Sequence, residues 1–173
     1  IIDTKPLIIE KQNNKDIHLK NDTTYNVKFS NVTFAYESSN KNILSNINLN
    51  IKRGEKIALV GYSGAGKTTL LNLLPRFYEI KRGRITINDI DIRDLSFGFL
   101  RNHFSLVSQD IVLFDDTIKY NICYGQNNIN NKKILEACKK ANCEEFIKKF
   151  PKGINETIGE KGVKLSGGQK QRI

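Results

Sequence analysis

No apolar segment in this sequence is long enough to cross a membrane. A membrane-spanning helix needs about 20 consecutive, mostly apolar residues, and no run in the 173 residues approaches that length. The first residues also lack the apolar core of a secretory signal. With 39% hydrophobic and 27% charged residues, the chain is expected to lie in water as one globular domain or most of one.

Residues that commonly bind metals are also scarce. The three cysteines, Cys123, Cys138 and Cys143, do not have the paired spacing of a zinc site. The two histidines, His18 and His103, have no partners at ligand spacing. These features indicate a reduced compartment, with all three cysteines serving as packing or surface residues.

Acidic residues are comparatively few: 18 Asp and Glu stand against 28 Lys and Arg, which gives the chain a net charge of +10. Such a charge could attract nucleic acid or an anionic membrane surface. The lysines are spread along the chain, however, and no aromatic residues interleave with them in a stacking pattern. The distribution favours a solvated basic surface, which could lie near anionic lipid, and we expect no nucleic-acid partner. No internal repeat, low-complexity tract or sustained heptad pattern is present.

The most informative stretch that is present runs from Gly54 to Pro75. The apolar run 56–60, bounded by glycines, predicts a buried strand. The run 70–74 is apolar at helical spacing, and Pro75 should end or kink that helix. Between the two runs lies the pattern G-x-x-x-x-G-K-[ST], a phosphate-binding loop in the strand-to-helix context that the pattern requires.

Each residue type in this loop suits a triphosphate such as that of ATP. Glycines permit the positive φ angles and the close backbone approach that side chains would prevent. The following helix would offer unpaired N–H groups and its positive dipole end. Lys67 would contact the β- and γ-phosphates, and the Thr68 hydroxyl would bind Mg²⁺. The alternative is a glycine-rich turn with a chance Lys-Thr pair. The predicted phosphate-binding residues are Gly61, Tyr62, Ser63, Gly64, Ala65, Gly66, Lys67, Thr68 and Thr69.

The residues before this loop predict an arm followed by strands. Residues 1–24 are polar and irregular and indicate a linker or extended arm. Residues 25–36 alternate imperfectly and predict one strand or a pair of strands, with a bulge or a turn at Ser30 and Asn31. Residues 43–51 alternate and predict another strand with one wet face. Residues 84–88 alternate again. We therefore expect antiparallel strands beside a central phosphate-loop strand.

From residue 94 the pattern becomes mainly helical. We predict a short helix over 95–102, a strand over 104–108 that ends at Gln109, and a helix capped by Asp116 or Thr117 that extends through Cys123. Residues 131–149 predict an amphipathic helix or a broken pair of helices. The expected organisation is a linker over 1–24, a β subdomain with the phosphate loop over 25–93, and a helical subdomain over 94–173.

A second candidate anion site lies near the end of the sequence. Ser166 is a good N-cap, and Gln169 stands where a capping-box partner would. Gly167 and Gly168 leave the backbone N–H groups of this helix start uncovered. Taken alone, the segment favours an ordinary capped surface helix.

Together with the phosphate loop, this segment resembles the signature of ABC transporter ATP-binding domains. The resemblance is to the exporter type, in which membrane and ATPase parts share one polypeptide, as in bacterial lipid-A and multidrug exporters. It covers essentially the whole chain, from a connector-like segment at 2–6 to the signature at 165–172. It implies an α/β P-loop NTPase fold of the ABC type, with an antiparallel β subdomain and a helical subdomain.

The resemblance also implies roles for residues outside the phosphate loop. Tyr36 would stack on adenine. Gln109, in the Q-loop at 106–110, would help hold Mg²⁺ or the attacking water, and with Lys67 it would be catalytic. Glu160 would face the transport machinery. ATP bound to one copy would be closed over by the signature of a second copy packed head to tail, through Ser166, Gly167, Gly168 and Gln169.

The sequence ends at Ile173, before the Walker B strand of the resembled family. We therefore expect the middle of the sheet to be vacant and this stretch alone not to hydrolyse ATP. The predicted function is to bind MgATP and, when complete and paired, to hydrolyse it at the cytoplasmic face of a membrane, beside a fused membrane domain, to export a lipid or other hydrophobic substrate. The alternatives are an importer's ATPase subunit, a soluble ABC-type ATPase, and an interaction module that binds no nucleotide.

Overall fold

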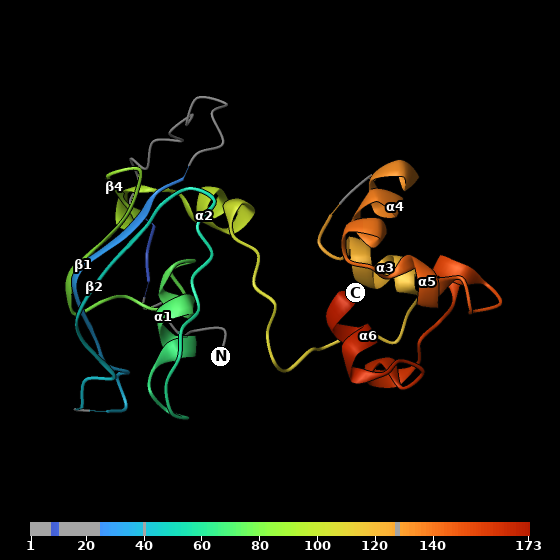
Figure 1. Cartoon of the computed structure of the whole chain (residues 1–173), viewed down its shortest axis with the longest axis horizontal. Helices are drawn as coiled ribbons and strands as arrows, with labels where there is room; N and C mark the ends of the chain where they lie inside the picture. Colours follow the sequence, from blue (N-terminus) through green and yellow to red (C-terminus); the bar gives the residue numbers. More distant parts are fainter. Residues whose placement is uncertain (1–7, 11–24, 40, 127–128) are drawn as a thin grey trace. The chain divides into compact units, whose positions relative to one another are not determined.

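The computed structural model describes residues 8–10, 25–39, 41–126 and 129–173, which form two compact units bounded as Ile1–Ser105 and Leu106–Ile173 (Figure 1). The predicted linker over 1–24 and the connector at 2–6 lie outside the described residues, apart from 8–10. The predicted subdomain division at residues 93 and 94 stays a prediction. Among the helices of the described ranges, none combines the length and apolar character needed to cross a bilayer.

The first unit contains a four-stranded antiparallel sheet in the order β2-β1-β3-β4. The alternating segments of the sequence form its three long strands, so those predictions are confirmed. Along β2 the apolar residues are partly buried and the asparagines are exposed, which gives the expected wet face. The strands are β1 (Val27–Phe34), β2 (Leu44–Ile51), β3 (Arg82–Ile87) and β4 (Ile90–Asp91).

The predicted kink in the first strand is a β-bulge. Asn31 has a φ of 51°, and the pairing of β1 with β3 shifts register between Ser30 and Thr33. Gly83 of β3 has a φ of 88°, and a Cβ atom there would lie 2.4 Å from the backbone oxygen of Asn31. Only glycine therefore fits where β3 crosses the bulge.

Helix α1 (Lys67–Leu73) packs its apolar residues against the sheet. It ends at Leu73, with Leu74 as its C-cap, just before Pro75, as predicted. Helix α2 (Phe97–His103) follows the 3-10 turn η1 (Ile92–Asp94) and is capped by the Ser96 hydroxyl. The most buried side chains of this core include Phe29, Val32 and Phe34 of β1, Ile85 of β3, and Leu73 of α1.

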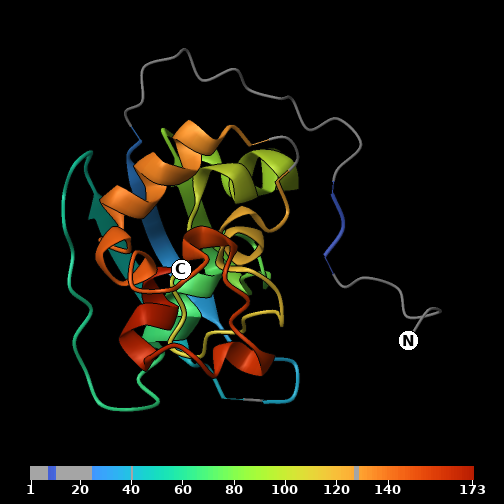
Figure 2. The ribbon, with the colours of Figure 1, turned by 90° about the vertical axis from the view of Figure 1, so that its right-hand side faces the viewer.

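The predicted buried strand over 56–60 is wrong. The trace between β2 and α1 is irregular (Figure 2), and no strand among the described residues pairs with it. A parallel strand needs neighbours on both sides to satisfy its backbone groups. Without them Val60 is 90% exposed.

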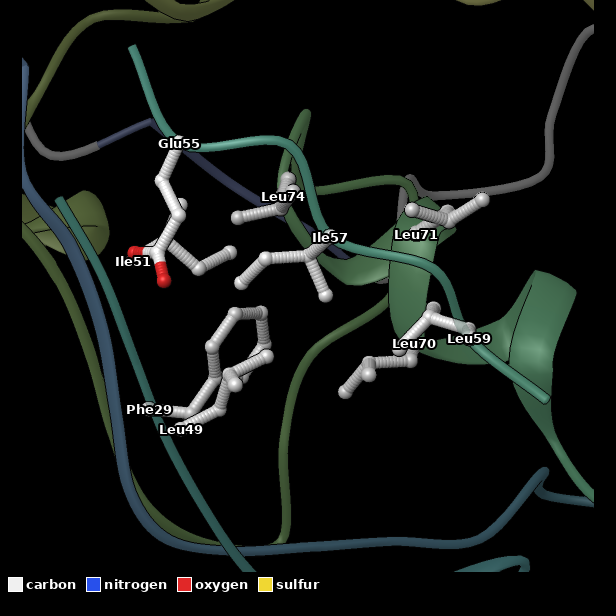
Figure 3. Close-up of a pocket in the computed structure, with 9 residues that line it drawn as sticks. All are labelled: Phe29, Leu49, Ile51, Glu55, Ile57, Leu59, Leu70, Leu71 and Leu74. Atoms are coloured by element: carbon white, nitrogen blue, oxygen red, sulfur yellow. The ribbon is translucent and has the colours of Figure 1, made fainter. Parts of the chain in front are cut away.

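Two apolar side chains of this segment, Ile57 and Leu59, nevertheless face the sheet. Ile57 and Leu59 line a cavity of about 220 Å³ together with Phe29 and Leu49 of the strands and Leu70 of α1. Figure 3 shows the side chain of Ile57 directed into this cavity. Ile57 and Leu59 are therefore used for packing, although the strand itself does not form.

The predicted strand over 104–108 is wrong for the same reason. Its residues form no strand, and none of the described strands pairs with them. Leu106 is 51% and Val107 is 73% exposed. An apolar run alone does not establish a strand when the ladder that would bury it is missing.

The second unit consists of short helices around its own apolar core. The predicted capped helix is confirmed, because the Thr117 hydroxyl accepts a hydrogen bond from the Tyr120 N–H. The expected helix or broken pair over 131–149 is a broken pair. The elements are α3 (Ile118–Cys123), α4 (Asn131–Lys140), α5 (Glu144–Ile147), η2 (Gly153–Asn155), η3 (Glu160–Gly162) and α6 (Gly167–Arg172).

The break between α4 and α5 is a Schellman turn. Asn142 has a φ of 54°. The Cys143 N–H donates to the carbonyl of Cys138 at 2.8 Å, and the Asn142 N–H donates to that of Lys139 at 3.1 Å. This turn brings Cys138 and Cys143 together in the core, where they are 2% and 1% exposed. Both are free thiols, as expected.

We expect Cys138 and Cys143 to resist alkylation, because burial raises the pKa of both thiols, that of Cys143 to about 11. Only the thiolate reacts. Iodoacetamide at pH 8, followed by peptide mass spectrometry, should label the half-buried Cys123 well before the other two. Because the raised pKa belongs to the folded state, these thiols should lower the free energy of unfolding only as the pH rises through the range from about 9 to 11. Labelling of Cys143 as fast as Cys123 would contradict this picture.

Candidate functional site

The predicted phosphate loop is an irregular turn that leads directly into α1. Gly64 and Gly66 have φ angles of 79° and 86°, in the left-handed region that favours glycine. Gly66 is the N-cap of α1 and has no side chain with which to close the helix start. Tyr62, Ser63, Gly64 and Ala65 are all exposed. The backbone of this turn is therefore open to a ligand.

Gly66 also fixes the loop to the sheet. A Cβ atom at this position would lie 2.9 Å from Leu44 Cδ2 and 3.1 Å from Ile43 Cγ2. The loop thus passes directly against the start of β2, and a side chain would push it away. The start of α1 is therefore placed by the sheet.

Lys67 curls back over this loop. Its ammonium group donates hydrogen bonds to the backbone oxygens of Gly61 at 2.9 Å and Tyr62 at 2.8 Å. The charge therefore lies at the mouth of the turn, next to the exposed loop backbone. Anionic oxygens are stronger acceptors for an ammonium group than carbonyl oxygens, so a bound phosphate would replace these contacts favourably.

The two threonines that follow differ in environment. Thr68 is exposed, so its hydroxyl is available to a ligand, whereas Thr69 is 6% exposed. The hydroxyl groups of Thr69 and Tyr36 are hydrogen-bonded at 2.9 Å. Tyr36, proposed from the sequence as the adenine platform, is therefore joined to the helix that carries Lys67.

Tyr36 lies two residues after the end of β1 and belongs to a cluster of three aromatic rings. The Tyr36 ring lies edge-to-face with Phe34 at a centroid distance of 4.9 Å and with Tyr78 at 5.1 Å. Sequence reasoning missed Tyr78. The only signal was an aromatic pair, Phe77-Tyr78, just after the helix, which does not reveal a neighbour more than 40 residues earlier in the chain.

Gln109 and the signature residues belong to the second unit. Gln109 is exposed, in a bend where the Ser108 hydroxyl donates to the backbone oxygen of Asp110 at 2.5 Å. Its amide is thus accessible to a ligand or a partner.

The signature segment forms the capping box predicted from its sequence. The Gln169 N–H donates to Ser166 Oγ at 3.3 Å, and the Ser166 N–H donates to Gln169 Oε1 at 2.9 Å. Gly167 and Gly168 are exposed, and a Cβ atom on either would meet nothing within 4 Å. Glycine lowers helix stability by about 1 kcal/mol relative to alanine, so the packing of this unit does not explain the pair. A close approach by something outside the unit would explain it.

An exposed aromatic cluster in the second unit was also missed. Phe114 stacks on Tyr124 at 4.4 Å, and Tyr120 lies edge-on to both. These three rings are 41%, 59% and 45% exposed, respectively. The spacing of Tyr120 and Tyr124, four residues apart, was the signal in the sequence that these two rings could lie on one side of a helix. Exposed aromatic clusters of this kind are typical of contact surfaces between proteins.

Within the described ranges, no three His, Cys, Asp or Glu side chains come together as a possible metal site. Mg²⁺ in phosphate-transfer proteins is commonly held by few protein ligands together with the substrate phosphates and water. The exposed hydroxyl of Thr68 beside the loop suits that arrangement.

Comparison with known proteins agrees with this geometry. The family model described as ABC transporter matches residues 44–173. An ATP-dependent lipid A-core flippase of Methylobacillus flagellatus is 50% identical over 148 residues, which cover 85% of this chain and 25% of that protein. A putative multidrug export ATP-binding/permease protein, YgaD of Bacillus subtilis, is 51% identical over 147 residues, again 85% of this chain and 25% of the relative. The chain thus spans about a quarter of the length of the curated relatives it matches.

A solved structure matches the fold as well. A bacterial Atm1-family ABC exporter with ATP bound is similar with a TM-score of 0.89 and 39% sequence identity. The match covers 99% of this chain and 30% of that one. The antiparallel sheet with its phosphate loop and the helical second unit are therefore those of an ABC-type P-loop ATPase domain.

Proposed function

The chain belongs to the ABC transporter family, and from this premise we propose that its loop from Gly61 to Thr69 binds the triphosphate of ATP. Membership of a family of ABC ATPase domains implies nucleotide binding. The observation that carries the proposal is the open turn at Gly64 and Gly66, with the Lys67 ammonium group held at its mouth by two backbone oxygens.

The proposed division of roles follows the environment of each residue. Lys67 neutralises the β- and γ-phosphates, where charge develops when the terminal bond breaks. Exposed Thr68 would bind Mg²⁺, which would neutralise charge on the phosphates, and the family resemblance assigns exposed Gln109 to the same ion. Tyr36 supplies the face on which adenine stacks. The backbone of the loop completes the cradle, through Gly61, Tyr62, Ser63, Gly64, Ala65, Gly66 and Thr69.

We further propose that the site is completed by a second copy of the domain. The open backbone at Gly167 and Gly168 is unexplained by packing within its own unit and suits contact with the γ-phosphate held by the other copy. Ser166 and Gln169 hold that helix start in shape through their reciprocal hydrogen bonds.

The protein that contains this chain is proposed to use ATP hydrolysis to export a substrate across a membrane, at whose cytoplasmic face the domain would lie. The relatives named as a lipid A-core flippase and a multidrug export ATP-binding/permease protein support this proposal and make a lipid or other hydrophobic substrate reasonable. The exposed cluster of Phe114, Tyr120 and Tyr124 offers a surface for the membrane domain. An importer subunit remains the alternative assignment, and transport assays on the intact protein in vesicles separate the two by direction.

ATP-driven pairing tests the proposal. With Mg²⁺ and ATP under conditions that prevent hydrolysis, analytical ultracentrifugation should show that the protein self-associates. Replacing Gly168 with Asp should abolish that association, because a carboxylate would face the γ-phosphate, while ATP binding to the separate copies should persist. The matched control is Gly98→Asp, at an exposed helical position without a positive φ, where a Cβ atom would meet only Ser96 Oγ at 4.0 Å; it should leave ATP-driven pairing intact. Association that is independent of ATP, or unaffected by Gly168→Asp, would contradict the proposed role of the signature.

A further inference from the structure

The segment that carries Tyr78 is fixed at both ends. Before it, the Phe77 N–H donates to the backbone oxygen of Asn72 at 3.2 Å. After it, the Lys81 N–H donates to the backbone oxygen of Thr33 at 3.0 Å. The loop between α1 and β3 is thus held against the last residues of β1, and it brings Tyr78 next to Tyr36, two residues after that strand ends.

The rings of Phe34, Tyr36 and Tyr78 pack around one another. The centroid distances are 4.9 Å from Phe34 to Tyr36, 5.1 Å from Tyr36 to Tyr78, and 5.7 Å from Phe34 to Tyr78. These distances form a compact triangle, so the Tyr36 ring is packed against both of the other rings. Tyr36 is only half-buried, so part of its ring remains accessible to a stacking partner.

The hydroxyl end of Tyr36 is fixed separately. It is hydrogen-bonded at 2.9 Å to the hydroxyl of Thr69, which is 6% exposed and lies two residues after Lys67 on α1. The Tyr36 ring is therefore held by ring contacts along its body and by a hydrogen bond at its tip. Holding a binding group in its bound orientation removes the ordering cost that binding would otherwise carry.

We propose that Tyr78 and Thr69 are positioning residues that hold the Tyr36 ring for a nucleotide base, and that the hydroxyl pair of Tyr36 and Thr69 fixes the spacing between the base platform and the phosphate loop. This inference rests on the proposed function, since it requires that Tyr36 receives the base and the loop receives the phosphates. It adds Tyr78, through its ring contact with Tyr36, to the residues that set affinity for an adenine nucleotide.

The test compares ATP with inorganic tripolyphosphate, which occupies the phosphate loop but has no base. Isothermal titration should show that Tyr78→Leu weakens ATP binding by about two- to tenfold, the range expected from loss of an aromatic pair. Tripolyphosphate binding should not change. Tyr78→Phe should restore ATP affinity, because the contacts that carry the proposal are made by the ring. Tyr36→Phe keeps the ring but removes the hydroxyl, and it should also weaken ATP by about two- to tenfold without weakening tripolyphosphate.

The matched control is Phe77→Leu, which also replaces an aromatic ring with leucine, one residue away. The described ring contacts of Tyr36 are with Phe34 and Tyr78 and do not include Phe77. This variant should leave the affinities for both ligands unchanged. If Tyr78→Leu weakens ATP and tripolyphosphate alike, or weakens neither, the positioning role of Tyr78 is overturned. If Tyr78→Leu does not fold, Tyr36→Phe decides, and an unchanged ratio of ATP to tripolyphosphate affinity overturns the inference. Failure of the unaltered protein to bind ATP would instead overturn the proposed function.

Discussion

Replacing Lys67 with alanine is expected to weaken ATP binding by about ten- to a hundredfold, the range for losing a charge-assisted hydrogen bond. The ammonium group lies at the mouth of the loop, 2.9 Å and 2.8 Å from the backbone oxygens of Gly61 and Tyr62. A triphosphate that enters the loop would take over these contacts. Without Lys67 the β- and γ-phosphates would lose a full positive charge. Hydrolysis by the protein that contains this chain should fall further, because charge also develops on these phosphates in the transition state. Titration calorimetry measures the change in affinity.

AMP provides the internal control for this variant, because it has no β- or γ-phosphate. Its affinity should be nearly the same in the unaltered protein and in Lys67→Ala. Lys133→Ala removes an equal charge from the exposed face of α4 and should leave ATP affinity unchanged. Equal losses for ATP and AMP would indicate that the loop had collapsed, and an unchanged ATP affinity would contradict the assigned role of Lys67.

Replacing Gly83 with alanine should destabilise the first unit by about 2–5 kcal/mol, through left-handed strain and overpacking together. The new Cβ atom would lie 2.4 Å and 2.5 Å from the backbone oxygens of Asn31 and Ser30. These atoms belong to the bulge of β1, which pairs with both β2 and β3, so they cannot move without disturbing two ladders. Urea unfolding followed by circular dichroism gives the change in free energy.

Gly54→Ala is the matched control for the strain alone. Gly54 has a φ of 71°, close to that of Gly83, but a Cβ atom there would meet nothing within 4 Å. It should cost only about 1–2 kcal/mol, so the difference between the two variants measures the clash. Equal destabilisation by both variants would show that the backbone of the bulge can move away from the new Cβ atom at little cost, despite its pairing with β2 and β3.

The sequence predicted elements whose determinants are local. The caps at Ser166 and Thr117, the end of α1 before Pro75 and the bulge at Asn31 each depend on a few neighbouring residues. The phosphate loop belongs to the same class, since its glycines and its lysine all lie within residues 61–67.

The predictions that failed depended on distant partners. The runs 56–60 and 104–108 have the composition of buried strands, but no strand among the described residues pairs with them. Whether a run of this kind forms a strand is decided by neighbours that its own residues do not specify. Tyr78 was missed for the same reason, because its contact with Tyr36 depends on how the loop after α1 returns to β1.

The central claim is that ATP is bound by the backbone between Gly61 and Thr69. The most direct measurement is the amide NMR spectrum of the protein labelled with ¹⁵N at its 12 glycines, recorded during titration with MgATP. The account predicts large, saturable shifts at Gly61, Gly64 and Gly66, and unshifted signals at Gly98 of α2 and at Gly83 beneath the bulge. Saturable binding with no shift at any of the three loop glycines, or shifts confined to other glycines, would contradict it.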